Sequence, residues 1–341
     1  MNLSIKFMKN LKNEIQSQEI SKKIINLIDN SERILITSHE NPDGDSIGSQ
    51  LALGGFLRDQ KKTFWILNHG NVPDKYKFID PNGFIQTEEI DVGINPDLVI
   101  VVECPNLNRV GWVKRFIGDH TPIINIDHHQ DNQNFGTLNF IDTSRAAVAE
   151  MIFDLISFNG YIPDRNCANA LFLAIYTDTG RFRHDSTTPE CLRKSARLLE
   201  LGADPKAIAD HAYYNYPAPA LKLLGMVLSK LELRLNGRVC YLTVTADDIK
   251  ATGANIADIE GIIDYGLFVE GVKVSLLFKQ LADDEIRVGF RCREGFDILP
   301  IARQFGGGGH HHAAGCSAPG TLECVKISML EILRRMLDGS Q

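Results

Sequence analysis

Residues 33–58 read RILITSHENPDGDSIGSQLALGGFLR. The first five residues form a short apolar run, which predicts a strand buried on both faces. Residues 46–58 place apolar side chains at helical spacing, so they predict a helix. The polar turn between them carries His39, Asp43 and Asp45. A strand that leads through a short turn into a helix is the repeating unit of a parallel α/β sheet.

The same alternation continues on both sides of this stretch. Further apolar runs at 63–67, 98–102 and 123–126 predict strands. Helical spacing is found at 8–29, within an N-terminal segment 1–30, and again at 147–158, 166–176 and 189–201. The sequence therefore predicts an α/β domain with a parallel sheet and a helical cap formed by its last three helices.

A second domain is expected after the segment YYNYPAP at 213–219, because two closely spaced prolines oppose a continuous helix or strand. We place the first domain at 1–216, a linker helix at 217–236 and the second domain at 237–341. The second domain reads as a smaller α+β unit, with strands at 239–244, 272–278 and 285–291 and helices at 256–268, 298–305 and 322–337.

The composition limits the classes of partner. A formal net charge of -7 leaves no global positive field, which argues against binding of long duplex nucleic acid. The seven cysteines are scattered and include no Cys-x-x-Cys pair, which is typical of reduced thiols. There is no apolar segment of about eighteen residues that could span a bilayer, and no secretory signal. We therefore expect a cytoplasmic protein without a membrane partner.

The turn after the first strand is the strongest chemical signal. His39, Asp43 and Asp45 supply an imidazole and two carboxylates, and Pro42 and Gly44 permit a tight turn that can direct them to one side. The alternative is an Asx turn that only caps the next helix. A calcium loop fits poorly, because no glutamate stands at the twelfth position.

Three weaker motifs follow along the chain. Asp127, His128 and His129 end another apolar run, so they are expected at the same sheet edge. Asp178 follows an apolar helix, where a helix cap is the competing interpretation. The glycine-rich segment 306–315 allows backbone N–H groups to approach a phosphate, or it is a flexible linker with a chance histidine run.

The chain carries four motifs in sequence: His-x-x-x-Asp-x-Asp, Asp-His-His, Thr-Asp-Thr-Gly and a glycine-rich His-x-x-Ala-Ala-Gly. These motifs, in this order, resemble those of the DHH phosphoesterase family. The match covers nearly the whole chain after residue 30, and it resembles most the branch of nanoRNases and 3'-phosphoadenosine-5'-phosphate phosphatases. The resemblance implies a DHH domain that binds two manganese ions, with Mg²⁺ or Co²⁺ as alternatives, and a DHH-associated domain that binds substrate. It places His39 and Asp43 on one metal, and Asp45, His128 and Asp178 on the other.

The resemblance also implies a carboxylate shared by both metals, at the end of the strand before Asp-His-His. Here Glu103 stands where the family has aspartate. Asp97 would lie about 20 Å away along an extended strand, so Glu103 is the only plausible bridge nearby. The longer side chain implies a shifted backbone or an altered metal spacing.

The family mechanism uses the two metals to activate a water that attacks phosphorus in line. By resemblance, His129 contacts the phosphate as charge develops and Asp127 orients a neighbouring ligand. Residues that would hold the far phosphate or the nucleotide end are Arg291, Gly307, Gly308 and His310. Arg109 is a further candidate, for which a surface ion pair is the alternative.

The expected activity is hydrolysis of short oligoribonucleotides and of 3'-phosphoadenosine-5'-phosphate-like bisphosphonucleotides. An alternative is a phosphodiesterase for cyclic or linear signalling dinucleotides, and pyrophosphate hydrolysis fits the glycine-rich domain less well. A different class is a nucleotide-binding protein without turnover, because Glu103 replaces the usual aspartate. A homodimer is compatible with the sequence, but no residue demonstrates it.

Overall fold

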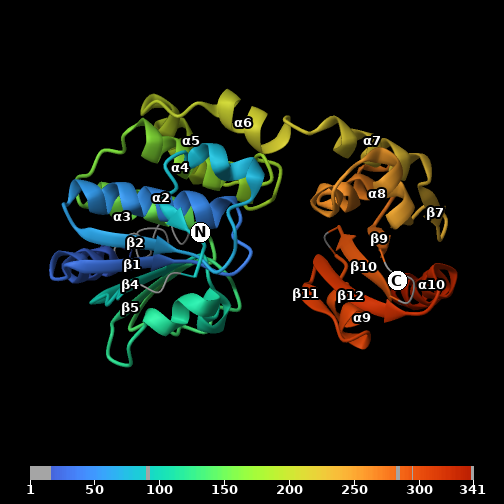
Figure 1. Cartoon of the computed structure of the whole chain (residues 1–341), viewed down its shortest axis with the longest axis horizontal. Helices are drawn as coiled ribbons and strands as arrows, with labels where there is room; N and C mark the ends of the chain where they lie inside the picture. The colour runs from blue at the N-terminus through green and yellow to red at the C-terminus, as the bar shows by residue number, and fades with distance from the viewer. Residues whose placement is uncertain (1–16, 90–92, 282–284, 294, 339–341) are drawn as a thin grey trace, which may run out of the picture. The chain divides into compact units, whose positions relative to one another are not determined.

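The computed structural model describes residues 17–89, 93–281, 285–293 and 295–338, with the side chains of His310 and Asp338 left out. The chain divides into two compact units, Met1–Asn215 and Tyr216–Gln341. Each unit is built around its own six-stranded sheet (Figure 1). A helix covers residues 17–29, and the rest of the N-terminal helix expected at 8–29 lies outside the described residues.

The sheet of the first unit is parallel throughout, as the apolar runs predict. Its strand order is β3-β2-β1-β4-β5-β6, so the chain moves outward from β1 on one side and then returns to β1's other side. The carboxyl ends of β1 and β4 therefore meet at the switch point, where α/β proteins bind ligands. The strands are β1 (Arg33–Thr37), β2 (Thr63–Leu67), β3 (Ile85–Gln86), β4 (Leu98–Val102), β5 (Ile123–Asp127) and β6 (Leu138–Ile141).

Both faces of this sheet are buried, which explains why its central strands are uninterrupted apolar runs. Ile34 and Ile100 point into a core shared with the helices on one face. Leu35 and Val99 point to the other face, under the 3₁₀ segment η2 (Leu107–Phe116). Figure 1 shows helices layered over the first face. They are α2 (Gly44–Asp59), α3 (Val148–Phe158), α4 (Arg165–Asp178), α5 (Pro189–Glu200) and α6 (Pro205–Tyr213), with a short 3₁₀ segment η1 (Asp74–Ile79) nearby.

The second unit is α+β, with strand order β11-β12-β10-β9-β8-β7. Only β8 and β9 are parallel, and the other neighbours are antiparallel. The strands are β7 (Glu232–Arg234), β8 (Val239–Thr245), β9 (Val274–Gln280), β10 (Glu285–Cys292), β11 (Gly308–His310) and β12 (Ala313–Pro319). The helical segments are α7 (Ala218–Ser229), α8 (Ala246–Thr252), η3 (Ile256–Ile259), η4 (Ile262–Phe268), α9 (Leu299–Gln304) and α10 (Leu322–Asp338).

Three local expectations for this unit are corrected. The helix predicted at 256–268 is two 3₁₀ segments, because Gly261 adopts a φ of 80° between them. The helix predicted at 217–236 ends at Ser229 and is followed by β7, which turns into β8 through Leu235, Asn236 and Gly237, all at positive φ. The glycine-rich segment is largely a hairpin of β11 and β12 and not a loop.

Two further findings bear on the class of protein. Five of the seven cysteines are buried and none is in a disulfide, whereas Cys316 is half-buried and Cys324 is exposed. Across the described ranges, every helix is too short or too polar to pass through a bilayer.

Candidate metal centre

The predicted ligands come from four segments that end at one edge of the first sheet. His39 follows β1, Glu103 follows β4, and His128 follows β5. The fourth segment is the end of α4, which carries Asp178. Because neighbouring parallel strands end at the same edge, residues far apart in the sequence are brought together here.

Helix α4 can approach the turn after β1 because α2 has glycines at the contact. A Cβ on Gly44 would lie 2.2 Å from Thr177 Oγ1, and a Cβ on Gly48 would lie 2.2 Å from the carbonyl oxygen of Ala170. Both distances are far below any real contact, so a larger residue would push the helices apart. The two glycines therefore bring Asp178 close to the turn that holds Asp45.

Among the described residues, three groups of side chains have ligand atoms that lie within 4.8 Å of one another. Two of them match the two ligand sets implied by resemblance, and the third joins Glu103 to the two histidines after β5. The groups are His39, Asp43 and Glu103; Asp45, His128 and Asp178; and Glu103, His128 and His129. The arrangement brings the six candidate ligands together, while their binding of metal stays a prediction.

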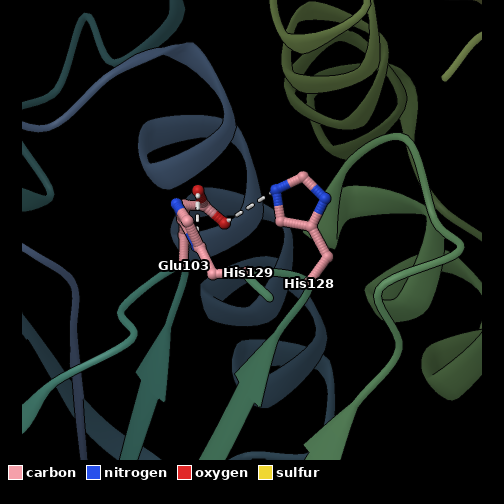
Figure 2. A group of neighbouring side chains, drawn as sticks. All are labelled: Glu103, His128 and His129. Atoms are coloured by element: carbon pink, nitrogen blue, oxygen red, sulfur yellow. Dashed lines mark ion pairs between the residues drawn. The ribbon is translucent and has the colours of Figure 1, made fainter. Parts of the chain in front are cut away.

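Glu103 lies at the centre of this arrangement. Its Oε2 is 3.5 Å from His128 Nε2, and its Oε1 is 3.5 Å from His129 Nδ1 (Figure 2). The side chain is buried, and Oε2 has no hydrogen-bond partner among the described residues. Its backbone has a φ of 52°, a left-handed conformation that costs about 1 kcal/mol or more outside glycine. A backbone shift that accommodates the longer side chain stays a prediction.

The carboxyl groups of the site are buried close to one another, and this raises the pKa of two of them. Burial, together with the charges of Glu103 and Asp178, raises the pKa of Asp45 well above its ordinary value. Burial also raises the pKa of Asp178 to about 7, with His128 opposing and Glu103 and Asp43 adding to the shift. Asp45 is held from behind, because it accepts hydrogen bonds from the backbone N–H groups of Val148 (2.5 Å) and Ala149 (3.0 Å) at the start of α3.

Each candidate histidine ligand is oriented by a carbonyl group. His128 Nδ1–H donates to the carbonyl oxygen of Arg145 (3.0 Å), and His39 Nδ1–H donates to that of Glu40 (2.6 Å). In both rings Nε2 therefore faces away from that carbonyl group: His39 Nε2 lies 2.9 Å from Ser46 Oγ, and His128 Nε2 lies 3.5 Å from Glu103 Oε2. Burial alone would lower the pKa of His128, but its contact with Glu103 and the charges of Asp178 and Asp45 raise it to about 11.

Asp127 lies beside His129, and its role in orienting a ligand stays a prediction. It accepts hydrogen bonds from the backbone N–H of His128 (2.8 Å), from His129 Nδ1–H (2.8 Å) and from the amide of Asn132 (2.5 Å). Burial would raise the pKa of Asp127, but these bonds and the His129 charge lower it. The pKa of His129 is raised to about 9, since the Asp127 bond and the Glu103 charge outweigh burial.

Asp127→Asn is expected to lower kcat/KM about 10- to 100-fold while metal binding is retained, because His129 loses its charged partner. Steady-state kinetics with Mn²⁺ and a Mn²⁺ titration measure the two effects. Asp131→Asn is the matched control, since Asp131 is exposed in the same loop. Wild-type kcat/KM in Asp127→Asn would show that Asp127 does not orient His129.

The residues present fit a pair of divalent cations. Glu103 Oε2 is a buried oxygen without a hydrogen-bond partner among the described residues, and burial together with the neighbouring carboxylate charges raises the pKa values of Asp45 and Asp178. Imidazole nitrogens mixed with carboxylate oxygens are a donor set that binds first-row divalent metals. A cation next to Glu103 would satisfy the oxygen and remove the repulsion.

The remaining candidate residues lie elsewhere. Arg109 is in η2, where its carbonyl oxygen accepts a hydrogen bond from Glu40 N–H (2.6 Å), and its half-buried guanidinium has no ion pair among the described residues. Arg291 lies on β10 of the second unit, with Nε 3.5 Å from Asp264. Gly307 precedes β11, and Gly308 and His310 lie in it. Their contact with substrate stays a prediction.

Sequence reasoning missed a group of charged residues behind the centre. Arg145, whose carbonyl orients His128, pairs with Asp142 at 2.9 Å and with Asp154 at 3.3 Å. Lys194 on α5 reaches Asp154 at 2.6 Å and Glu150 at 3.6 Å, and it is only 5% exposed. Asn132 was missed as well. The sequence holds no spacing signal that separates these residues from an ordinary solvated surface.

A parallel sheet with buried imidazoles and carboxylates at its switch point, followed by a glycine-rich α+β unit, defines the class of metal-dependent phosphoesterases. Residues 33–175 match the model of the DHH family, N-terminal domain, and residues 236–337 match the DHHA1 domain.

The chain is also similar to named proteins over most of its length. The chain is 33% identical to the bifunctional oligoribonuclease and PAP phosphatase NrnA of Thermus thermophilus, over 89% of this chain and 90% of that protein. It is 26% identical to the protein of the same name in Bacillus subtilis, over 86% and 92%. The crystal structure of an exopolyphosphatase-related protein from Bacteroides fragilis aligns with a TM-score of 0.86 at 24% identity, over 94% and 97%. This chain belongs to the DHH family of phosphoesterases, whose enzymes use divalent metals.

Proposed function

We propose that this chain is a two-metal phosphoesterase that hydrolyses short oligoribonucleotides and 3'-phosphoadenosine-5'-phosphate-like bisphosphonucleotides. The observation that carries the proposal is the buried oxygen of Glu103, which lies between two ligand sets and has no hydrogen-bond partner in the described chain. The substrate class is supported by the relatives named as oligoribonucleases and PAP phosphatases. Mn²⁺ is the proposed ion and the cytoplasm the proposed location.

In this proposal His39 and Asp43 would hold one cation, Asp45, His128 and Asp178 would hold the other, and Glu103 would serve both sets. Such cations would supply the lowered pKa of a water nucleophile and would draw charge from the phosphoryl oxygens. The chain's own contribution is to fix positions. The N–H groups at the start of α3 hold Asp45, and carbonyl groups orient both imidazoles.

His129 has a further role that its surroundings support. Burial would lower the pKa of His129, but its hydrogen bond to Asp127 and the charge of Glu103 raise the pKa to about 9. A protonated imidazole can donate a hydrogen bond to a phosphoryl oxygen as negative charge develops there. Asp127 keeps the ring in place while this happens.

The test is hydrolysis by the purified full-length chain with Mn²⁺ against four substrates, namely a diribonucleotide, 3'-phosphoadenosine-5'-phosphate, a cyclic dinucleotide and pyrophosphate. We expect cleavage of the first two, with kcat/KM at least about tenfold above the others. A preparation of Glu103→Gln made in parallel controls for contaminating nucleases. Preferred cleavage of the cyclic dinucleotide would replace the proposed substrate class, and no cleavage of any substrate would favour a binding protein without turnover.

A further inference from the structure

A pocket in the first unit lies away from the candidate metal centre. Its volume is 350 Å³, and α2, α4, α6, β2 and η1 all contribute to its lining. This volume falls within the usual range for small-molecule sites. None of the candidate metal ligands is among the described residues that line it. The pocket is therefore a separate cavity that the proposed function leaves unused.

The pocket lies at the far ends of two helices that carry candidate metal ligands. On α2, Gly55 of the pocket is about 15 Å along the helix axis from Asp45. On α4, Cys167 of the pocket is about 16 Å from Asp178. The two helices therefore run in opposite directions between the pocket and the metal centre, and they contact each other at both ends.

Three phenylalanine rings contribute to the lining. Phe64 comes from β2, and Phe78 comes from η1, where its ring stacks on His211 of α6 with centroids 4.4 Å apart. The third ring, Phe84, is 42% exposed. Aromatic side chains of this kind favour a flat apolar ligand, which they contact by offset stacking or edge to face.

Gly55 widens the pocket at a cost to α2. A Cβ at this position would lie 3.6 Å from Tyr161 Oη and 3.8 Å from Cys167 Cβ, so packing does not require glycine here. Glycine within a helix is about 1 kcal/mol less favourable than alanine. Gly54 is different, because its Cβ would lie 3.0 Å from Ile66 Cδ1. Gly55 is thus a residue that the fold does not need but that gives the cavity its room.

Arg58 is a cation of this pocket that forms no ion pair with a described residue. Its guanidinium lies over the Phe84 ring, 5.6 Å from the centroid. The other cation, Arg165, pairs with Asp204 at 3.7 Å. The carboxylates that line the pocket each accept a hydrogen bond from a backbone N–H group of their own segment, and they are Asp80, Asp164 and Asp204. An anionic group on a ligand is therefore complementary to Arg58.

We propose that this pocket is a regulatory site for a small aromatic carboxylate. The flat ring lies among the phenylalanine side chains over Gly55, and the carboxylate accepts hydrogen bonds from Arg58. Because α2 and α4 carry Asp45 and Asp178 at their other ends, a ligand that holds the two helices together strengthens cation binding. The inference goes beyond the proposed function, since the ligand is bound and not hydrolysed.

The class of ligand is tested by calorimetric titration of the metal-free full-length chain with 2-naphthoate, 2-naphthylmethylamine and 2-naphthylmethanol. These probes share one ring system and differ in charge. We expect 2-naphthoate to bind at least about tenfold more tightly than the other two. Equal or tighter binding of the amine or the alcohol would overturn the carboxylate class, and no binding of any probe would overturn the site.

Two variants locate the bound probe. Arg58→Met removes the charge, and Gly55→Leu places a side chain where the ring lies, so we expect Kd for 2-naphthoate to rise about tenfold or more in each. Arg334→Met is the matched control and should bind like the wild type, since Arg334 is exposed on α10 of the second unit. Arg58 is itself exposed, so its variant remains a test if Gly55→Leu does not fold. Wild-type affinity in either folded variant would overturn the site.

The regulatory role is tested by titrating Mn²⁺ into the full-length chain with and without saturating 2-naphthoate. We expect Kd for Mn²⁺ to fall about fivefold or more when the probe is bound, and Mn²⁺ to tighten the probe by the same factor. Arg58→Met should lose this effect. An unchanged or weaker Mn²⁺ affinity would overturn the regulatory role. Both titrations measure binding alone, so a chain that hydrolyses none of the proposed substrates can still pass them.

Discussion

Glu103→Gln is expected to lower kcat/KM by at least about 10³-fold with every substrate, equivalent to about 4 kcal/mol of transition-state stabilisation. Glutamine has nearly the same size, so the fold should be kept. The change removes the negative charge that lies 3.5 Å from both His128 and His129. One substitution would therefore weaken both proposed metal sets at once.

Thermal unfolding with and without Mn²⁺ separates this loss from misfolding. In the wild type, Mn²⁺ at about 100 times its Kd adds about 2.7 kcal/mol of stability and raises Tm. We expect little or no rise for Glu103→Gln, with a far-UV spectrum like that of the wild type. Full activity in this variant would exclude Glu103 as a ligand.

Glu103→Asp distinguishes a catalytic site adapted to glutamate from a degenerate site that has lost activity. The shorter side chain withdraws the carboxylate from the two imidazoles. A site adapted to glutamate should lose activity in this variant, whereas a degenerate site should gain it. We expect a loss, because the shorter side chain would lengthen the 3.5 Å distances from the carboxylate to His128 Nε2 and His129 Nδ1.

Lys194→Met should destabilise the first unit by about 3 kcal/mol, because it removes the nearer of the two cations that pair with Glu150 and Asp154. Glu150 is 1% exposed, so its charge cannot be solvated without a local opening of the structure. Arg145 remains nearby, with Nη1 3.9 Å from Glu150, which limits the loss. The same opening would move the carbonyl group that orients His128, so Mn²⁺ affinity should fall as well.

Urea unfolding followed by tryptophan fluorescence measures this effect selectively, because Trp65 and Trp112, the only two tryptophans, both lie in the first unit. Lys206→Met is the matched control. Its partner is Asp210 on the same helix, and the Lys206 side chain is 84% exposed. Exposed pairs of this kind contribute about 0–1 kcal/mol. Equal shifts in both variants would show that Lys194 is not part of a stabilising network.

The strands at the centre of the first sheet could be predicted to the residue. β1, β2 and β4 match the apolar runs at 33–37, 63–67 and 98–102, because strands buried on two faces must be apolar throughout. The edge strands β3 and β6 were not predicted. β3 has two residues, and β6 is mostly half-buried, so neither gives a clear pattern. The hairpin at Gly308 was missed because glycine carries no strand signal.

The residues of the candidate site could be predicted where polar side chains directly follow an apolar strand in the sequence. His39, Glu103 and His128 all stand just past an apolar run, and parallel strands bring such positions to one edge. The supporting residues were not predictable, since a buried lysine on an amphipathic helix, such as Lys194, has the same sequence pattern as a solvated one. The backbone N–H groups that donate hydrogen bonds to Asp45 belong to Val148 and Ala149. The identity of these apolar side chains does not predict such hydrogen bonds.

The contact of α2 with α4 through Gly44 and Gly48 links the distance between these helices to the spacing of the proposed cations. Neither glycine is a candidate ligand, yet a single added methyl group at Gly48 would meet the Ala170 carbonyl and force α4 outward. Asp178 would move with it. Variants along this seam should therefore first show altered cation selectivity, and only with larger residues the loss of the folded state.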